Sequence, residues 1–304
     1  MSTFNPADPI QVQKLLKTLE ADLEEASLAL YQTPTRKHLG LSIIGEDCAR
    51  KLWLDFRHAI VHKDFSNSSK SNGQMLRLFN HGTVIEHAPL ELLVEMGFRP
   101  VEDPVDENGF PTQHRTQRYA NGHVGGSMDG LMYLPAKFGD FLCIIEVKTS
   151  ASSEFRKLKS EGVQLHRYMH WCQMCSYGYD KGAPYGLYVA LNKDTDEIYF
   201  EFLQLNLELG KDMILKGEAI VNAKTPPQRI AASPTSWKCA AKNKKCPFIS
   251  ICHHDEVMHK SCRSCSHGTA GPNATWTCDA SGGATIPEEV VATGCEIYAA
   301  IPKD

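Results

Sequence analysis

Residues 141–150 read FLCIIEVKTS, an apolar run that contains one carboxylate and one lysine. Turn residues flank the run, and this pattern is typical of a buried central strand in an α/β sheet. Alternate residues of a strand share a face, so Glu146 and Lys148 should point the same way while Val147 packs behind them. Burying either charge without a partner costs several kcal/mol. The pattern therefore predicts a compensating group, and a divalent cation is the natural choice.

A second strand-like segment, RYANGHVGGSMDGLMYL (residues 118–134), comes just before this run, and PAKFGD (135–140) joins the two. Because PAKFGD is rich in turn residues, the two segments should form a hairpin. In such a hairpin Asp129 and Glu146 can lie side by side on neighbouring strands. Their oxygens, together with a backbone carbonyl and waters, suit Mg or Mn in octahedral geometry.

Asp129, followed at a loop-length distance by Glu146-Val147-Lys148, resembles the signature of the PD-(D/E)XK nuclease superfamily. The resemblance implies an α/β fold with a restriction-endonuclease-like core, in which helices flank a central mixed sheet. It also implies phosphodiester hydrolysis, with Asp129, Glu146 and the Val147 carbonyl holding Mg or Mn. Lys148 would then position or deprotonate the attacking water.

Gln164 and Tyr168 form a Q-x-x-x-Y pair further along the chain. The pair resembles the extra motif of the RecB-like and CRISPR-adaptation exonuclease branch of the superfamily. Residues four apart share one face of a helix, so both side chains should point to the same place. The resemblance implies that they hold the strand end or a flanking phosphate.

A helix is expected over MLRLFNHGTVIEHAPLELLVEMGF (residues 75–98), where apolar residues recur at helical spacing. Within it Gly82 precedes Glu86 by four residues. This spacing resembles the G-x-x-x-(E/H) helix that supplies a further acidic or histidine ligand in the same superfamily. Glu86 is the expected ligand, and His81 and His87 are close enough to compete with it.

The cysteine count is high for a chain of this kind, with eleven in all. Cys48, Cys239, Cys246 and Cys252 resemble the cluster ligands of iron–sulfur members of the RecB-like and CRISPR-adaptation branch. The gap between Cys239 and Cys246 is longer than the C-x-x-C usual there. Four thiolates suit a [4Fe-4S] cluster or zinc, and cysteine identity leaves both open.

A second cysteine set lies at the C-terminal end, where Cys262-x-x-Cys265 is followed by Cys278 and Cys295. A C-x-x-C knuckle with two more cysteines in a short Gly-rich segment is a strong signal for a zinc ribbon or finger. His267 is a possible substitute ligand. The segment resembles the cysteine-rich tails of some phage-encoded nucleases of this superfamily.

The remaining sequence patterns suggest how the chain is organised. Apolar residues at near-helical spacing predict an amphipathic helix from Asp8 to about Leu30, and Cys172 and Cys175 are assigned to core packing on a later helix. We expect four segments: an N-terminal helical segment over 1–40, a nuclease core over 41–230, a cysteine triplet over 231–258 that closes a site with Cys48, and a zinc-ribbon-like tail over 259–304.

Composition sets the outer limits of function. Hydrophobic residues make up 42% of the 304 and charged residues 22%, as in an ordinary soluble globular protein. No stretch approaches the roughly 18 apolar residues of a membrane span, and the start MSTFNPADPI lacks the features of a signal peptide. We therefore expect a cytoplasmic protein. The net charge of −4 argues mildly against a nucleic-acid binder, although basic clusters occur at 36–38, 50–51, 156–159 and 238–245.

The motifs favour a metal-dependent DNA exonuclease that acts in recombination or repair. An endonuclease of the same fold is one alternative, and a non-catalytic nucleic-acid- or partner-binding protein built on the cysteine modules is another. The sequence contains no GxxxxGK phosphate loop, so unwinding of DNA would need a separate helicase. A single-strand annealing protein is a further expected partner.

Overall fold

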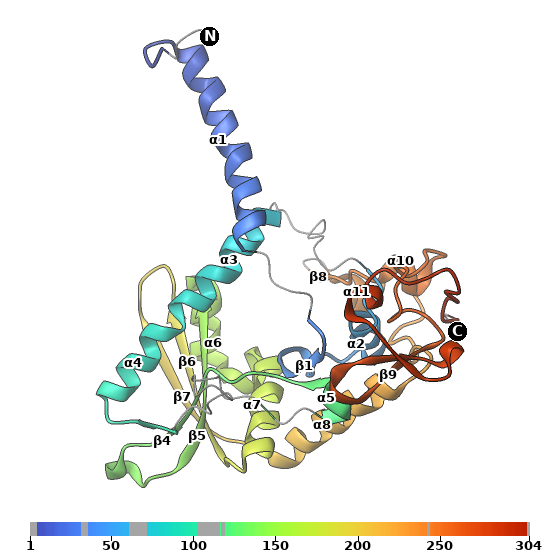
Figure 1. Ribbon diagram of the computed structural model, residues 1–304. Coiled ribbons are helices and arrows are strands. Elements are labelled where there is room, and N and C mark those ends of the chain that lie inside the picture. Colours follow the sequence, from blue (N-terminus) through green and yellow to red (C-terminus); the bar gives the residue numbers. More distant parts are fainter. Residues whose placement is uncertain are drawn as a thin grey trace. The chain divides into compact units, whose positions relative to one another are not determined.

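The computed structural model describes residues 5–31, 36–60, 72–101, 116, 119–241 and 244–302. The chain divides into two compact units, one formed by residues 1–35 and 62–85 and the other by 36–61 and 86–304. Figure 1 labels the elements of both units. The turn-rich stretch GFRPVEDPVDENGF (residues 97–110) is expected to be an irregular sheet edge, and residues 102–110 of it lie outside the described residues. Among those described, none of the helices is both long and apolar enough to cross a membrane.

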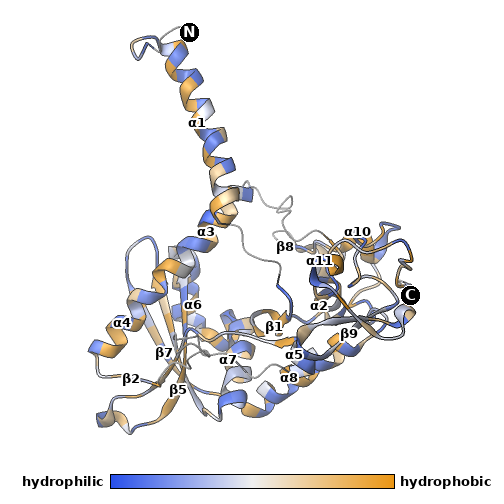
Figure 2. Ribbon diagram, viewed as in Figure 1, coloured by the Kyte–Doolittle hydropathy of each residue, from blue (hydrophilic) through white to orange (hydrophobic). Residues whose placement is uncertain are grey.

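The first unit consists of helices α1 (Pro9–Leu30) and α3 (Asn72–Ile85). Asp8 caps α1 by accepting hydrogen bonds from the backbone N–H groups that follow it, so the helix expected from residue 8 to about residue 30 is confirmed. The two helices contact each other through Arg77, whose guanidinium donates to Ser27 Oγ at 2.6 Å. Figure 2 shows apolar and polar residues alternating along α1.

The second unit is built on a five-stranded sheet of order β2-β4-β5-β6-β7. Its central pair, β5 and β6, runs parallel, and the other neighbours are antiparallel, so the sheet is mixed. The strand expected from the FLCIIEVKTS run is present as β5, as are the expected hairpin of β4 with β5 and the later pair of strands. The strands are β2 (Arg99–Pro100), β4 (Gly130–Tyr133), β5 (Leu142–Ser150), β6 (Tyr185–Asn192) and β7 (Ile198–Gln204).

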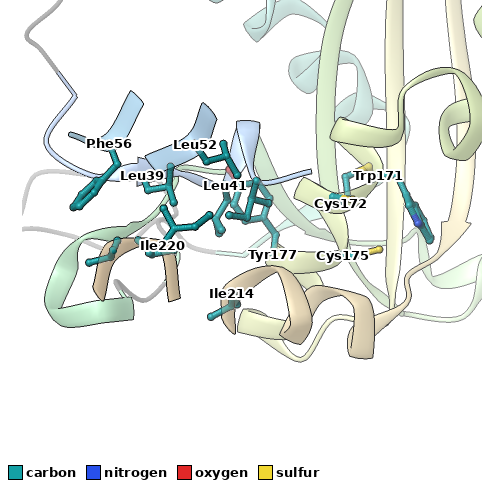
Figure 3. Close-up of a cluster of buried hydrophobic side chains, with 14 of the residues drawn as sticks. Leu39, Leu41, Leu52, Phe56, Trp171, Cys172, Cys175, Tyr177, Ile214 and Ile220 are labelled. Atoms are coloured by element: carbon teal, nitrogen blue, oxygen red, sulfur yellow. The ribbon is translucent and has the colours of Figure 1, made fainter. Parts of the chain in front are cut away.

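Both faces of this sheet are buried, which explains the continuous apolar run in β5. On one face Ile144 belongs to a large core that includes residues of α6 (Ser152–His166), α7 (Tyr168–Lys181) and α8 (Leu207–Asn222). On the other face Ile145 and Val147 pack with Leu93 of α4 (His87–Glu95). Figure 3 shows part of the larger core, including Cys172 and Cys175. Both cysteines are fully buried, so their assignment to core packing is confirmed.

The single strand expected over residues 118–134 is wrong. The chain forms α5 (Tyr119–Gly122) and β3 (Val124–Gly125) before β4 begins at Gly130. The break comes from successive residues with positive φ, Ala120 at 47° and Asn121 at 57°, which no strand accommodates. β3 instead pairs in parallel with β1 (Leu39–Gly40), which η1 (Leu41–Ile43) and α2 (Ala49–Phe56) follow.

The cysteine-rich region forms short elements that end in a small antiparallel sheet of order β11-β10-β9. Trp276 of this sheet is buried against Phe56, and the guanidinium groups of Arg57 and Arg263 lie 5.3 and 5.2 Å from its ring centroid. Arg57 also donates to the carbonyls of Arg263 and Gly268, both at 3.1 Å. Two buried arginines thus attach the small sheet to the end of α2.

The elements of this region are α9 (Trp237–Ala240), β8 (Lys244–Lys245), α10 (Ile249–His253), β9 (Gly268–Ala270), η3 (Pro272–Ala274), β10 (Trp276–Cys278), η4 (Asp279–Ser281), β11 (Ala284–Ile286) and α11 (Glu288–Val291). A further turn, η2 (Ala136–Phe138), lies in the loop between β4 and β5.

Candidate active site

Two carboxylates and a lysine meet where β4 begins beside β5. Gly130 is paired with Ile145 across the hairpin, so the preceding residue, Asp129, lies next to Glu146. Asp129 Oδ2 accepts a hydrogen bond from the Val147 N–H at 2.8 Å and lies 3.2 Å from Lys148 Nζ. Lys148 Nζ is also 2.7 Å from Glu146 Oε1. The structure therefore brings Asp129, Glu146 and Lys148 together, with Lys148 between the two carboxylates.

Burial controls the charges of this cluster. Glu146 is fully buried, and desolvation raises its pKa to about 7, against the opposing charge of Lys148. Burial alone lowers the pKa of Lys148, but the charges of Glu146 and Asp129 outweigh it and raise that pKa above its usual value. The ammonium also donates to the Val147 carbonyl at 2.8 Å. Without a bound cation, Lys148 is thus the positive charge that compensates the carboxylates.

Glu86 belongs to the same charged group, although the single helix expected over residues 75–98 is wrong. The helix ends at Ile85 and a new one begins at His87, leaving Glu86 half-buried at the junction. Its pKa is raised, first by burial and then by the charge of Asp129. His81 and His87 are both exposed. Of the three expected alternatives, the structure places Glu86 in electrostatic contact with Asp129.

Gln164 and Tyr168 do not share a helix face, so that expectation is wrong. α6 ends at His166, Arg167 takes the non-helical angles φ −128° and ψ 47°, and α7 starts at Tyr168. The glycine before this break, Gly162, has φ 74°, which interrupts the helical direction once more. Both Gln164 and Tyr168 are exposed. The two side chains therefore do not point the same way, although they are four residues apart.

A second Q-x-x-x-Y occurs inside α7, from Gln173 to Tyr177, and the sequence analysis missed it. Gln173 is 5% and Tyr177 1% exposed. Gln173 Nε2 donates to Glu146 Oε2 and to Tyr177 Oη, each at 3.2 Å, and Tyr177 Oη donates to the Ser127 carbonyl at 2.9 Å. The two residues are four apart within one helix, so they share a face of α7. The sequence feature that could have identified this pair is a single glutamine within an apolar helical stretch.

His170 and Tyr188 also lie beside the cluster without having been expected there. His170 is three residues before Gln173, so the two share a face of α7, and Tyr188 is paired with Glu146 across β5 and β6. His170 Nδ1 lies 2.7 Å from Tyr188 Oη, and the two rings are stacked. Burial, followed by the charge of Lys148, lowers the pKa of His170 to about 3, so the imidazole is neutral near pH 7.

The first cysteine set surrounds one cavity of about 610 Å³, which Cys48, Cys239, Cys246 and Cys252 all line. Cys48 caps α2, and its Sγ accepts from the Lys51 N–H at 3.4 Å. The pKa of the Cys239 thiol is raised by burial and then by the charges of Cys48 and Cys252. The chain thus gathers four cysteines from distant segments around one space.

The second set is also gathered. Burial raises the pKa of Cys262, and the charges of Cys295, Cys265 and Cys278 add to this effect. The Cys265 N–H donates to the Cys262 carbonyl at 3.4 Å, which closes a tight knuckle. A Cβ at Gly268 would lie 2.0 Å from that carbonyl oxygen, so the knuckle requires glycine there. His267, a possible substitute ligand, is partly buried.

Side chains that lie close together do not by that alone coordinate a metal ion. In the part of the chain that the structure describes, no group of three or more His, Cys, Asp or Glu side chains has an arrangement that could hold a metal ion. At the carboxylate site, Asp129 and Glu146 are paired with Lys148. A cation there would therefore require the two carboxylates to turn from the lysine.

Comparisons with known proteins give distant likenesses only. No family model and no curated protein matches the chain. Among solved structures, a protein named SSO0001 is 16% identical at a TM-score of 0.41, with 79% of this chain and 98% of that one covered. An alkaline exonuclease (LHK-Exo) from Laribacter hongkongensis is 16% identical at a TM-score of 0.39 (66% of this chain, 90% of that one). The same exonuclease in complex with dAMP is 14% identical at 0.36, with the same coverage. These similarities decide neither the fold nor the activity of this chain.

Proposed function

We propose that this chain is a metal-dependent DNA exonuclease that hydrolyses phosphodiester bonds. The observation that carries the proposal is the placement of Asp129 and Glu146 side by side on adjoining strands, with Lys148 within 3.2 Å of both. This is the arrangement that the D…ExK resemblance implies. It lies on a buried sheet, whose rigidity keeps such a constellation in place.

The donor set fits a hard divalent cation. Asp129, Glu146 and the Val147 carbonyl would hold Mg or Mn, with Glu86 contributing at the margin, and these oxygens are the ligands that such ions prefer. Three carboxylates against one lysine leave excess negative charge for a cation to neutralise. Gln173 Oε1 is buried without a hydrogen-bond partner among the described residues, an acceptor that a bound water could satisfy. The cation would stabilise the charge that builds on the phosphoryl oxygens during hydrolysis.

The protein's own residues then have separate tasks. Lys148 would orient the attacking water as an ammonium. A cation beside it would favour its neutral form, and in that form it would take the proton of the water. Gln173 holds Glu146 in one orientation through its hydrogen bond, and Tyr177 holds Gln173 in turn. Gln164 and Tyr168, being exposed, would contact the DNA strand rather than the buried carboxylates.

The cofactors and partners of the remaining regions are part of the same proposal. Cys48, Cys239, Cys246 and Cys252 would hold a [4Fe-4S] cluster or zinc, and a cavity of about 610 Å³ between them has room for the larger group. Cys262, Cys265, Cys278 and Cys295 would hold zinc. The partners would be DNA, a helicase and a single-strand annealing protein, in recombination or repair in the cytoplasm.

The test is incubation of the full chain with end-labelled linear DNA, with Mg, with Mn and with EDTA. We expect release of mononucleotides with either metal, none with EDTA, and none from Asp129→Asn. Glu208→Gln, a change at an exposed carboxylate on α8, is the matched control and should keep full activity. Full activity of Asp129→Asn would refute the proposal. Cleavage of closed circular DNA would instead identify an endonuclease.

A further inference from the structure

Trp237 differs from the other tryptophans of the chain. Its side chain is 76% exposed, whereas Trp53, Trp171 and Trp276 are at most 6% exposed and belong to the core. It is the first residue of α9, whose start is capped by the Ser236 hydroxyl. An indole in this position presents a flat aromatic surface to solvent.

Lysines lie beside Trp237, in a cavity that apolar residues such as Ile230 and Phe248 also line. The Lys238 ammonium lies 5.9 Å from the centre of the Trp237 ring, and both residues line the same cavity as the exposed Lys245. Besides the four cysteines of the proposed metal site, the cavity lining has four cationic side chains against two carboxylates, and one of those carboxylates, Glu46, is already paired with Lys51. An exposed aromatic ring among lysines fits a ligand that has both flat rings and negative charges.

The loop that carries the cavity-lining Glu46 packs against α7, the helix that also positions the carboxylate site. Gly45, beside the cavity-lining Glu46, lies so close to α7 that a Cβ there would be 3.0 Å from Met169 Cα. Lys216 fixes this loop by donating to the carbonyls of Ile44 at 2.9 Å and Glu46 at 2.6 Å. Further along α7, Gln173 donates to Glu146. One rigid helix therefore connects the two regions.

We propose that Trp237, Lys238 and Lys245 form a binding site for single-stranded DNA, in which a base stacks on the indole and the ammonium groups pair with phosphates. Stacking requires an unpaired base, because bases inside a duplex have no free face. The site would hold the strand whose end is hydrolysed, and in this respect the proposal rests on the proposed function. Lysine is depleted at protein–protein interfaces, so Lys238 and Lys245 beside the indole favour DNA over a protein partner.

The experiment measures binding of an oligothymidine to the full chain by intrinsic fluorescence. Because Trp237 is the exposed one of the four tryptophans, quenching by iodide and by DNA reports on this residue. The measurement uses the Asp129→Asn background, where no cleavage is needed, so its outcome is independent of whether the protein is a nuclease. We expect DNA to quench the emission and to protect Trp237 from iodide.

Trp237→Ala lacks the reporting indole, so its Kd is measured by the anisotropy of a dye-labelled oligothymidine, and it should rise about tenfold because the surface on which a base stacks is gone. Trp237→Phe keeps an aromatic ring, so its Kd should rise less than that of Trp237→Ala. Because the change is smaller, this variant also guards against a result caused by failure to fold. Lys238→Gln with Lys245→Gln should reduce the slope of log Kd against log salt by about 1.4, or about 0.7 for each phosphate contact. Phe138→Ala, which removes an exposed ring that also has a lysine beside it, is the matched control and should leave the Kd unchanged. Wild-type affinity in Trp237→Ala, or absence of DNA-dependent quenching, would overturn the proposal.

Discussion

Replacing Gln173 by leucine tests whether this residue, rather than Gln164, supports the carboxylate site. Leucine nearly preserves the volume of the side chain but removes the hydrogen bond to Glu146 Oε2 at 3.2 Å. Glu146 is completely buried, so water cannot replace the lost donor. A hydrogen bond to a charged acceptor contributes about 1.5–3 kcal/mol, and one to a neutral acceptor about 0.5–1.5 kcal/mol.

The expected loss of stability depends on pH because Glu146 titrates near pH 7 in the folded protein. In EDTA at pH 8.5 the carboxylate is ionised, and the free energy of unfolding should fall by about 2 kcal/mol. At pH 5 the carboxyl is protonated, and the loss should shrink to about 1 kcal/mol. Urea unfolding followed by circular dichroism measures both values.

Nuclease activity in Mg should fall together with stability, by roughly tenfold, because an unsupported Glu146 is free to leave its position. Gln164→Leu is the comparison with the same chemical change at an exposed residue, and its stability should stay within about 0.5 kcal/mol of wild type. Equal losses for the two variants, or a Gln173→Leu loss that does not change between pH 5 and pH 8.5, would refute the reasoning.

Three further predictions follow from the same contacts. In EDTA the wild-type free energy of unfolding should fall by about 3 kcal/mol between pH 4.5 and 7, because the raised pKa of Glu146 favours the protonated folded state; in Glu146→Gln this part of the urea-monitored pH dependence should disappear. Lys148→Met should lower the free energy of unfolding by about 3 kcal/mol at pH 8, the low end for breaking a buried pair, because the Lys148 side chain is 27% exposed. Added Mg should recover part of this loss. Absence of recovery in urea titrations would argue against a cation site. Arg57→Met removes the donor to three carbonyls, those of Ala223, Arg263 and Gly268, and should cost about 2 kcal/mol and speed proteolysis beyond residue 259; an unchanged proteolysis rate would contradict this role.

The sequence was informative where burial controls the pattern. The apolar run of β5 with Glu146 and Lys148 two residues apart was sufficient to predict the strand, the hairpin and the proximity of Asp129, since alternation along a strand leaves few choices. The grouping of Cys262, Cys265, Cys278 and Cys295 followed from spacing, whereas Cys48 joined Cys239, Cys246 and Cys252 through a resemblance, and coordination by either set stays a prediction.

Two errors concern where helices end, which composition hides. Glu86 separates α3 from α4 although it keeps helical angles, φ −59° and ψ −26°. Arg167 is a good helix former, yet the backbone breaks there between α6 and α7. Spacing alone could not show that Gln164 and Tyr168 lie on either side of such a break. Gln173 was passed over because it is surrounded by residues that pack in the core, where an amide reads as an ordinary buried polar group.

The parallel pairing of β5 with β6 has a consequence for inheritance. The crossover between these strands contains α6 and α7, so the residues around Lys148 from Asp129 to Tyr188 come from one uninterrupted segment, with Glu86 as the outside contributor. Because the segment is continuous, these residues can be inherited together as one piece of chain. The flanking helices and cysteine modules are then free to diverge around it.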